Sequence, residues 1–142
     1  MFELHERLKA DTWELGEFPL CLLLLSKDAN YPWTILVPKR AGITEIYQLI
    51  SSDRQQLLHE SCLLAEAMQS LFSPDKLNIA TIGNIVNQLH MHHVARTPDD
   101  IAWPGPVWGA ANALSYSAVD SDSTLAKLRA HLVKDLLTPK AG

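Results

Sequence analysis

The segment 88–94 alternates polar and apolar side chains in a way that limits how the chain can fold. It reads Gln88-Leu89-His90-Met91-His92-His93-Val94. In a β-strand, side chains two residues apart lie on the same face of the sheet. A strand over about 88–95 therefore places Gln88, His90 and His92 on one face and turns Leu89 and Met91 into apolar packing. The alternation predicts a polar, reactive strand face that is backed by a hydrophobic core.

Three apolar runs precede this segment and predict an antiparallel meander. They cover residues 11–15, 20–26 and 33–37, and turn-forming residues separate them. Pro38 and Gly42 follow the third run. Because proline cannot donate a hydrogen bond to a strand ladder, we expect the third strand to end there.

A long helix is expected after the meander, over about 52–72. Ser52 and Gln55 have the spacing of a capping box, and apolar residues then recur at helical intervals. A strand over 77–82 is expected next, paired with the histidine-bearing strand. The order of strands, helix, strands indicates an α+β fold with helices on one face of the sheet.

A second helix is expected near the C-terminus, over about 122–137. Its candidate N-caps are Ser121, Asp122 and Ser123, and its leucines form one apolar stripe. With 142 residues, of which 47% are hydrophobic, the chain has the size of one domain. We expect a single domain over 1–142, with its core at about 11–108.

Charge and cysteine content exclude several classes of function. The net charge is −4, and the 12 basic residues form no stripe that would suit polymeric nucleic acid. Cys21 and Cys62 lie within apolar runs, which favours buried thiols in a reducing compartment. The acidic N-terminal residues are not typical of a secretory signal, and the apolar run 20–25 is far shorter than the roughly 20 residues of a membrane span. We expect a cytoplasmic protein with no membrane partner.

The segment 88–94 resembles the motif of the histidine triad (HIT) superfamily, in which three histidines alternate with hydrophobic residues. Gln88 stands at the first histidine position, His90 at the second and His92 at the third, and His93 replaces a residue that is usually apolar. The resemblance implies a HIT-like five-stranded antiparallel sheet and a homodimer. It also implies nucleotide hydrolase or nucleotidyl transferase activity, with hydrolysis favoured, on a purine nucleotide or dinucleoside polyphosphate.

The resemblance assigns a role to each member of the motif. His90 is the candidate nucleophile, because a neutral imidazole can attack the α-phosphate of a nucleotide ester, anhydride or phosphoramidate and form a nucleotidyl-histidine intermediate. Its other ring nitrogen needs a fixed acceptor such as a backbone carbonyl. His92 would stabilise the departing group. Gln88 can position the substrate but cannot carry a proton.

The same resemblance extends to two neighbouring segments. Gly83-Asn84 is similar to the glycine turn that precedes the triad, so Asn84 is a candidate phosphate ligand, with Asn78 as a second. The segment 103–109 is similar to the tryptophan loop that follows the triad and closes the leaving-group pocket of the neighbouring subunit. Trp103 is therefore a candidate for closing that pocket across a dimer, and the equal alternative is that both indoles of the loop only cover the core. We expect the base pocket near Phe18 and residues 20–24.

Two alternatives stay open. His90 and His92 could chelate a divalent metal, although no third ligand is evident, because His93 is expected on the core side with a backbone carbonyl as its partner. Alternatively, Gln88 could disable turnover and leave a noncatalytic nucleotide sensor. The covalent route requires no cofactor, although Mg²⁺ could accompany a polyphosphate substrate.

Overall fold

The computed structural model describes residues 1–138 and is built around a five-stranded antiparallel sheet. The strands are β1 (Thr12–Glu17), β2 (Cys21–Ser26), β3 (Trp33–Pro38), β4 (Lys76–Ala80) and β5 (Met91–Arg96). Their order across the sheet is β1-β2-β3-β5-β4, and every neighbouring pair is antiparallel. The meander of β1 to β3 and the pairing of β4 with β5 confirm the α+β fold expected from the sequence.

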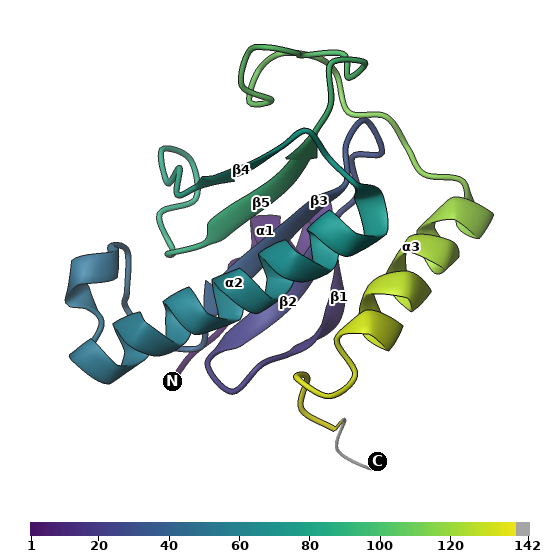
Figure 1. The fold of residues 1–142 in the computed structure, drawn as a ribbon. Coiled ribbons are helices and arrows are strands. Elements are labelled where there is room, and N and C mark those ends of the chain that lie inside the picture. The colour runs from purple at the N-terminus through teal and green to yellow at the C-terminus, as the bar shows by residue number, and fades with distance from the viewer. Residues whose placement is uncertain (139–142) are drawn as a thin grey trace.

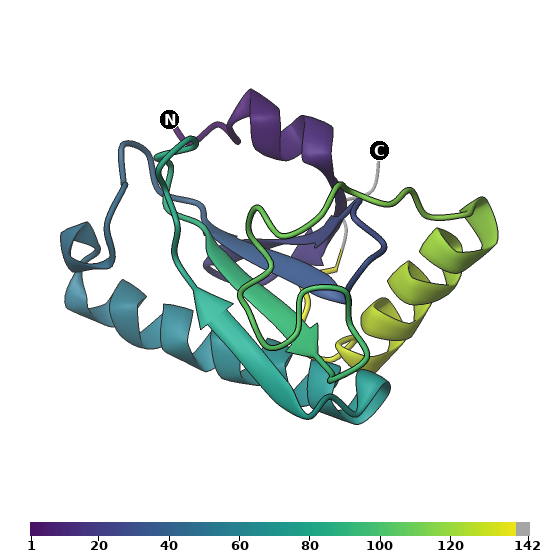
Figure 2. The ribbon, with the colours of Figure 1, turned by 90° about the horizontal axis from the view of Figure 1, so that it is seen from above.

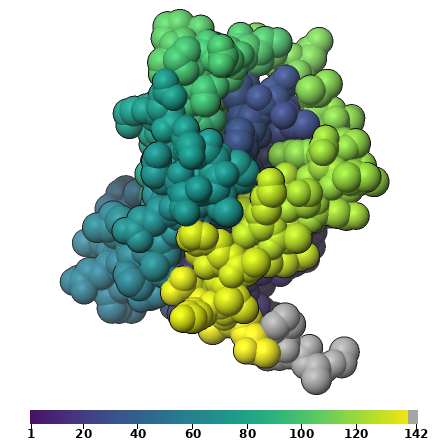
Figure 3. Space-filling model, turned by 45° about the vertical axis from the view of Figure 1, so that its right-hand side comes forward, coloured from purple at the N-terminus to yellow at the C-terminus, as the bar shows by residue number. Residues whose placement is uncertain are grey.

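Helices cover both faces of this sheet. The long helix α2 (Ser51–Phe72) and α3 (Ala118–His131) lie side by side on one face (Figures 1 and 3). The short helix α1 (Glu6–Asp11) lies on the opposite face (Figure 2), and a 3₁₀ turn, η1 (Ile46–Gln48), precedes α2. The two helices expected from the sequence, α2 and α3, share one face as predicted, whereas α1 on the other face was not expected. Within residues 1–138, no helix is long and apolar enough to cross a membrane.

The predicted helix caps are also corrected. The helix α2 begins at Ser51 with Ile50 as its N-cap and no side-chain cap, so Ser52 does not form a capping box. The helix α3 begins earlier than expected, because the Ser117 side chain accepts a hydrogen bond from the backbone N–H of Asp120. That hydrogen bond satisfies an N–H group that has no partner within the helix.

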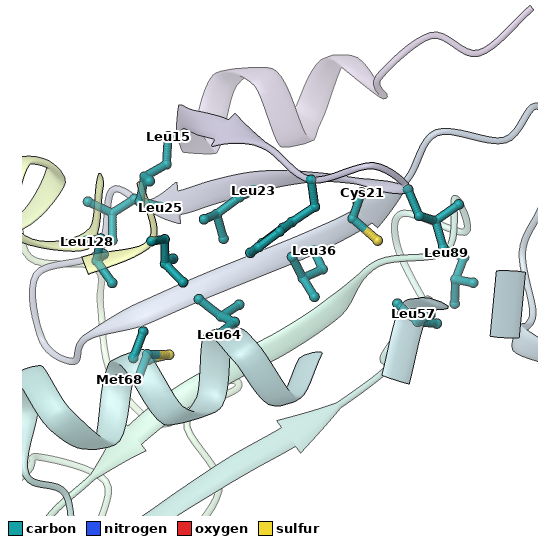
Figure 4. Close-up of a cluster of buried hydrophobic side chains, with 14 of the residues drawn as sticks. Leu15, Cys21, Leu23, Leu25, Leu36, Leu57, Leu64, Met68, Leu89 and Leu128 are labelled. Carbon is teal, nitrogen blue, oxygen red and sulfur yellow. The ribbon is translucent and has the colours of Figure 1, made fainter. Parts of the chain in front are cut away.

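Strand β2 is buried on both faces, and its side chains alternate between two cores. Leu23 and Leu25 point toward α2 and α3, where they pack with Leu64 and Leu128 (Figure 4). Leu22 and Leu24 point the other way and pack with Leu8, Ile35, Val37 and Val86 beneath α1. The sheet therefore packs against a large, continuous core on its α2 face and against a smaller, interrupted core on its α1 face.

Candidate active site

The two motif histidines meet on the α1 face of the sheet. His92 lies on β5, opposite Ile35 of β3 and Ala80 of β4, and His90 lies just before the strand. Their ring centroids are 4.8 Å apart, and both side chains are almost fully buried. Both border the same cavity. The structure therefore brings together the two imidazoles that the alternating pattern pairs.

Gln88 does not join them in the way the sequence predicts. Strand β5 begins at Met91, because the chain leaves the ladder at Leu89, whose N–H donates to the carbonyl of Ile43 at 2.9 Å. The Gln88 side chain holds the N-terminal arm, accepting from the N–H of His5 and donating to the carbonyl of Glu3, both at 2.9 Å. The prediction that one strand face carries all three side chains is therefore wrong.

His90 is held in one tautomer by its own turn. Its Nδ1 lies 2.7 Å from the backbone carbonyl of Gln88. A carbonyl only accepts, so Nδ1 carries the proton and Nε2 keeps its lone pair. Nε2 has no hydrogen-bond partner among residues 1–138. In this geometry Nε2 is the ring nitrogen that is available as a nucleophile, and the acceptor is of the backbone kind that the sequence analysis expected.

His92 is held in the opposite tautomer. The indole Nε1 of Trp33 donates to its Nδ1 at 3.0 Å, so the ring proton belongs on Nε2. Burial, together with the neighbouring His90 and His93, lowers the pKa of His92 to about 3. His92 is therefore a neutral imidazole that offers an N–H donor.

The cavity beside the two histidines is large enough for a small organic ligand. Its volume is about 620 Å³, within the range of roughly 300–1,000 Å³ that ligand sites occupy. Apolar side chains from α1, β3 and the turn before β5 form much of its wall, and charged side chains lie at α1 and the β2–β3 turn. The wall includes Leu8, Trp33, Ile35, Val86 and Trp108.

A second, more polar cavity of about 490 Å³ adjoins the first. Ile82, Asn84 and His90 border both cavities. Asn84 lies in the turn after β4, where a Cβ on Gly83 would come within 3.3 Å of the Val86 carbonyl. Glycine thus eases a close backbone approach in this turn, and Asn84, like His90, borders both cavities.

Phe18 and residues 20–24, which the sequence analysis expects near a base pocket, are not among the residues that line either cavity. Phe18 is fully buried in the core on the α2 side, and it does not line the cavity. Because β2 is buried on both faces, its composition does not show which of its side chains lie toward the cavity. The residues that do line the cavity include Trp33, Trp108 and helix α1, which the sequence analysis did not select.

Comparisons with known proteins agree with this geometry. The family model described as "HIT domain" matches residues 7–99, which is more than half of the chain. This chain belongs to the HIT domain family. A comparison with curated proteins found no match. HIT proteins are in general nucleotide-binding hydrolases or transferases, although some are not catalytic.

Three solved HIT structures are similar to this chain along nearly its whole length. A histidine triad protein from Marinobacter aquaeolei VT8 is 50% identical, with a TM-score of 0.92, and the match covers 95% of this chain and 98% of that one. One from Bradyrhizobium japonicum is 41% identical, with a TM-score of 0.90 and coverage of 96% and 98%. One from Sinorhizobium meliloti 1021 is 38% identical, with a TM-score of 0.89 and coverage of 96% and 98%.

Two candidate ligands of the HIT site lie outside both cavities. Asn78 of β4 accepts a hydrogen bond from the buried Arg96 at 2.7 Å. Arg96 also forms a two-point ion pair with Asp100, and its guanidinium lies 5.8 Å from the ring centroid of Trp103. These contacts anchor the segment after β5. Trp108, in the same segment, lines the larger cavity instead, with its ring 5.1 Å from that of His92.

The neighbouring His93 faces the opposite side of the sheet, as expected. It is fully buried, its Nδ1 donates to the carbonyl of Met91 at 3.2 Å, and its Nε2 accepts from the Ser61 hydroxyl of α2 at 2.7 Å. It therefore cannot join His90 and His92 around one ion. Among residues 1–138, no group of three or more His, Cys, Asp or Glu side chains is arranged to hold a metal.

Proposed function

We propose that this HIT protein binds a purine nucleotide and hydrolyses it at the α-phosphate through a nucleotidyl-histidine intermediate on His90. The observation that supports this most directly is the tautomer of His90. Its Nδ1 proton is bound to the Gln88 carbonyl, so Nε2 has a free lone pair where the two cavities meet. An imidazole in this state is a competent nucleophile toward phosphorus near neutral pH.

The two cavities suit the two parts of such a substrate. The larger cavity has apolar and aromatic walls, which suit a purine and its ribose. The smaller one is lined mainly by polar residues and suits a polar leaving group. His92 would donate to the phosphate or leaving-group oxygen, and the amide of Asn84 would donate to a phosphate oxygen. Gln88 would position the site through its backbone carbonyl. Asn78 is left out of this proposed site because it is bound to Arg96, and Trp103 stays a candidate for closing the pocket of a partner subunit.

We further propose that the protein is a cytoplasmic homodimer. Strand β4 is an edge of the sheet, and the exposed Ile79 on it leaves apolar surface for a second copy. Cys21 and Cys62 are both free thiols, which suits a reducing compartment; Cys21 is buried as expected, whereas Cys62 is exposed, contrary to the expectation of two buried thiols. The covalent route requires no cofactor, and a polyphosphate substrate would bring its own Mg²⁺.

The test is to trap the intermediate. The protein is incubated with a panel of adenylates, quenched, and analysed by mass spectrometry for a nucleotide adduct on His90. We expect the adduct in the native protein, and a fall in turnover of at least about 1,000-fold in His90→Ala, as when other covalent nucleophiles are removed. His59→Ala is the matched control, since His59 is an exposed histidine on α2.

Three results would contradict the proposal. Full turnover by His90→Ala would exclude His90 as the nucleophile. Tight nucleotide binding without turnover of any adenylate would favour a noncatalytic sensor. Stoichiometric zinc in protein purified without added metal, lost in His90→Ala, would favour a metal site.

A further inference from the structure

The hydrogen bond between Trp33 and His92 limits what His92 can do. Trp33 lies on β3, two residues from Ile35, the residue directly opposite His92 on β5. Its indole N–H points at Nδ1 of His92 at 3.0 Å, and the two rings are tilted by 58°. Tyr31 and Trp108 pack edge-on against the Trp33 indole, with centroids 6.1 Å and 6.0 Å away. The indole is therefore held in place by its neighbours.

An indole N–H is a donor only, so Nδ1 of His92 must accept. A proton on Nδ1 would face the indole proton, which disfavours the imidazolium form. The remaining N–H, on Nε2, can donate a hydrogen bond. It cannot be transferred to a leaving group, because its loss would leave an imidazolate anion in a buried site. His92 can stabilise a departing negative charge but cannot act as a general acid.

Other groups in the site do not supply that proton. His90 uses Nδ1 for the Gln88 carbonyl and Nε2 for attack, and the Gln88 amide does not titrate. Lys27 also lines the larger cavity, but its ammonium group lies over the ring of Trp13, 5.7 Å from the ring centroid, and Trp13 is not part of the wall. The other charged residues of the two cavity walls are a guanidinium and carboxylates, from Arg7, Asp11, Asp28 and Glu45.

We propose that Trp33 is a positioning residue that fixes His92 as a hydrogen-bond donor, and that it thereby restricts this site to phosphorus–oxygen anhydrides, whose leaving group departs as a stable anion. The inference rests on the nucleotidyl-transfer function proposed above. Carboxylate from an acyl adenylate and phosphate from a phosphoanhydride both leave without a proton. The amine of a phosphoramidate must be protonated as the P–N bond breaks.

The two steps balance without an acid. In the first, the Nε2 lone pair of His90 forms a bond to the α-phosphorus, the P–O bond to the leaving group breaks, and the anion leaves against the Nε2–H of His92. In the second, water attacks phosphorus and the P–Nε2 bond breaks. The lone pair returns to His90, and the water proton passes to solvent. The products are a nucleoside monophosphate, the free anion and one proton.

The first arm of the test is the tautomer itself. Long-range ¹H–¹⁵N NMR of the histidine side chains distinguishes a protonated from an unprotonated ring nitrogen. We expect His92 of the native protein to carry its proton on Nε2 and to stay neutral down to pH 5. In Trp33→Phe, which keeps an aromatic ring but removes the N–H, we expect a proton on Nδ1 in part of the population. Trp108→Phe is the matched control, since Trp108 also packs on His92 but makes no hydrogen bond to it.

The second arm measures kcat/KM for acetyl adenylate, diadenosine diphosphate and an N-alkyl adenosine phosphoramidate at pH 6. Trp33→Phe should raise the ratio of phosphoramidate to anhydride turnover by at least about tenfold, a part of the roughly 10²–10⁴-fold that general acid catalysis contributes. Trp108→Phe should leave this ratio unchanged. The two anhydrides separate carboxylate from phosphate as the leaving group.

The outcomes distinguish this inference from the function on which it rests. Turnover with an unchanged ratio in Trp33→Phe, or a proton on Nδ1 of His92 in the native protein, would overturn the inference and leave the nucleotidyl-histidine route standing. Turnover of none of the three substrates would overturn both.

Discussion

Glu60 is a fully buried carboxylate whose removal should destabilise the fold strongly. It projects from α2 toward the start of β2, where Oε2 accepts from the N–H of Leu20 and Oε1 from the N–H of Cys21, both at 2.9 Å. Gln56 donates a third hydrogen bond at 2.7 Å. Burial raises the pKa of the Cys21 thiol, and the nearby Glu60 charge raises it further.

The cost of Glu60→Ala can be worked from these contacts. Two backbone N–H groups at buried residues lose their acceptor, and each unsatisfied group costs about 1–3 kcal/mol. The gross loss is therefore about 2–6 kcal/mol. Relief of the desolvation cost of a buried charge offsets part of it, so we expect the free energy of unfolding to fall by about 2–4 kcal/mol. The loss for Glu60→Gln should lie between zero and the loss for Glu60→Ala, because the glutamine amide retains one acceptor oxygen.

Urea denaturation followed by tryptophan fluorescence measures this loss. Glu66→Ala is the matched control, since Glu66 is an exposed residue of the same helix, and surface changes typically stay within about 0.5 kcal/mol. The reasoning would be refuted if Glu60→Ala unfolded at the same urea concentration as the native protein, or if Glu66→Ala cost as much.

Two further predictions concern stability and the N-terminal arm. Burial lowers the pKa of His93 to about 4, so below pH 6.5 the unfolded chain takes up a proton at this residue that the folded chain does not. The free energy of unfolding should therefore fall by up to about 3 kcal/mol from this group as the pH drops from 6.5 to 4. Urea titrations at several pH values should show a weaker pH dependence in His93→Gln. An equal slope in the variant would assign the acid sensitivity elsewhere. Gln88→Ala removes both hydrogen bonds to the N-terminal arm, so amide exchange at residues 3–8 should quicken by about five- to thirtyfold at unchanged global stability, as one to two net hydrogen bonds of about 1 kcal/mol each imply. Unaltered exchange there would show that the arm is held by other contacts.

The elements that sequence analysis predicted are those with strong periodicity. Helix α2 and all five strands follow from helical spacing, alternation and turn residues. Helix α1 was missed because it is only six residues long and buries a single side chain, Leu8, so it carries almost no periodic signal. The start of α3 was missed because its N-cap, Ser117, lies before the acidic and serine-rich stretch that suggested Ser121.

The site was predictable only in part, for a physical reason. Alternation places His90 and His92 on one side of the chain, and the structure brings their rings together. The start of β5 depends on the hydrogen bond from the N–H of Leu89 to the carbonyl of Ile43. The tautomer of His92 depends on the hydrogen bond from the indole N–H of Trp33. These contacts join segments tens of residues apart, so local spacing does not contain them. The two tryptophans of segment 103–109 drew attention to this loop, but their spacing did not show that Trp108 would line the cavity of its own chain.

The four consecutive leucines of β2 have a consequence for how the sheet assembles. Leu22 to Leu25 are identical, so sliding this strand by one position would exchange the side chains of its two faces without changing their hydrophobicity. The correct alignment must therefore be enforced from outside the run. The hydroxyl-bearing residues can do this, because Ser26 is matched with Thr12 and Leu25 with Thr34, and a slipped strand would put those polar groups opposite the wrong neighbours. The four leucines let the strand pack against the cores on both faces of the sheet, while the residues around them set its register.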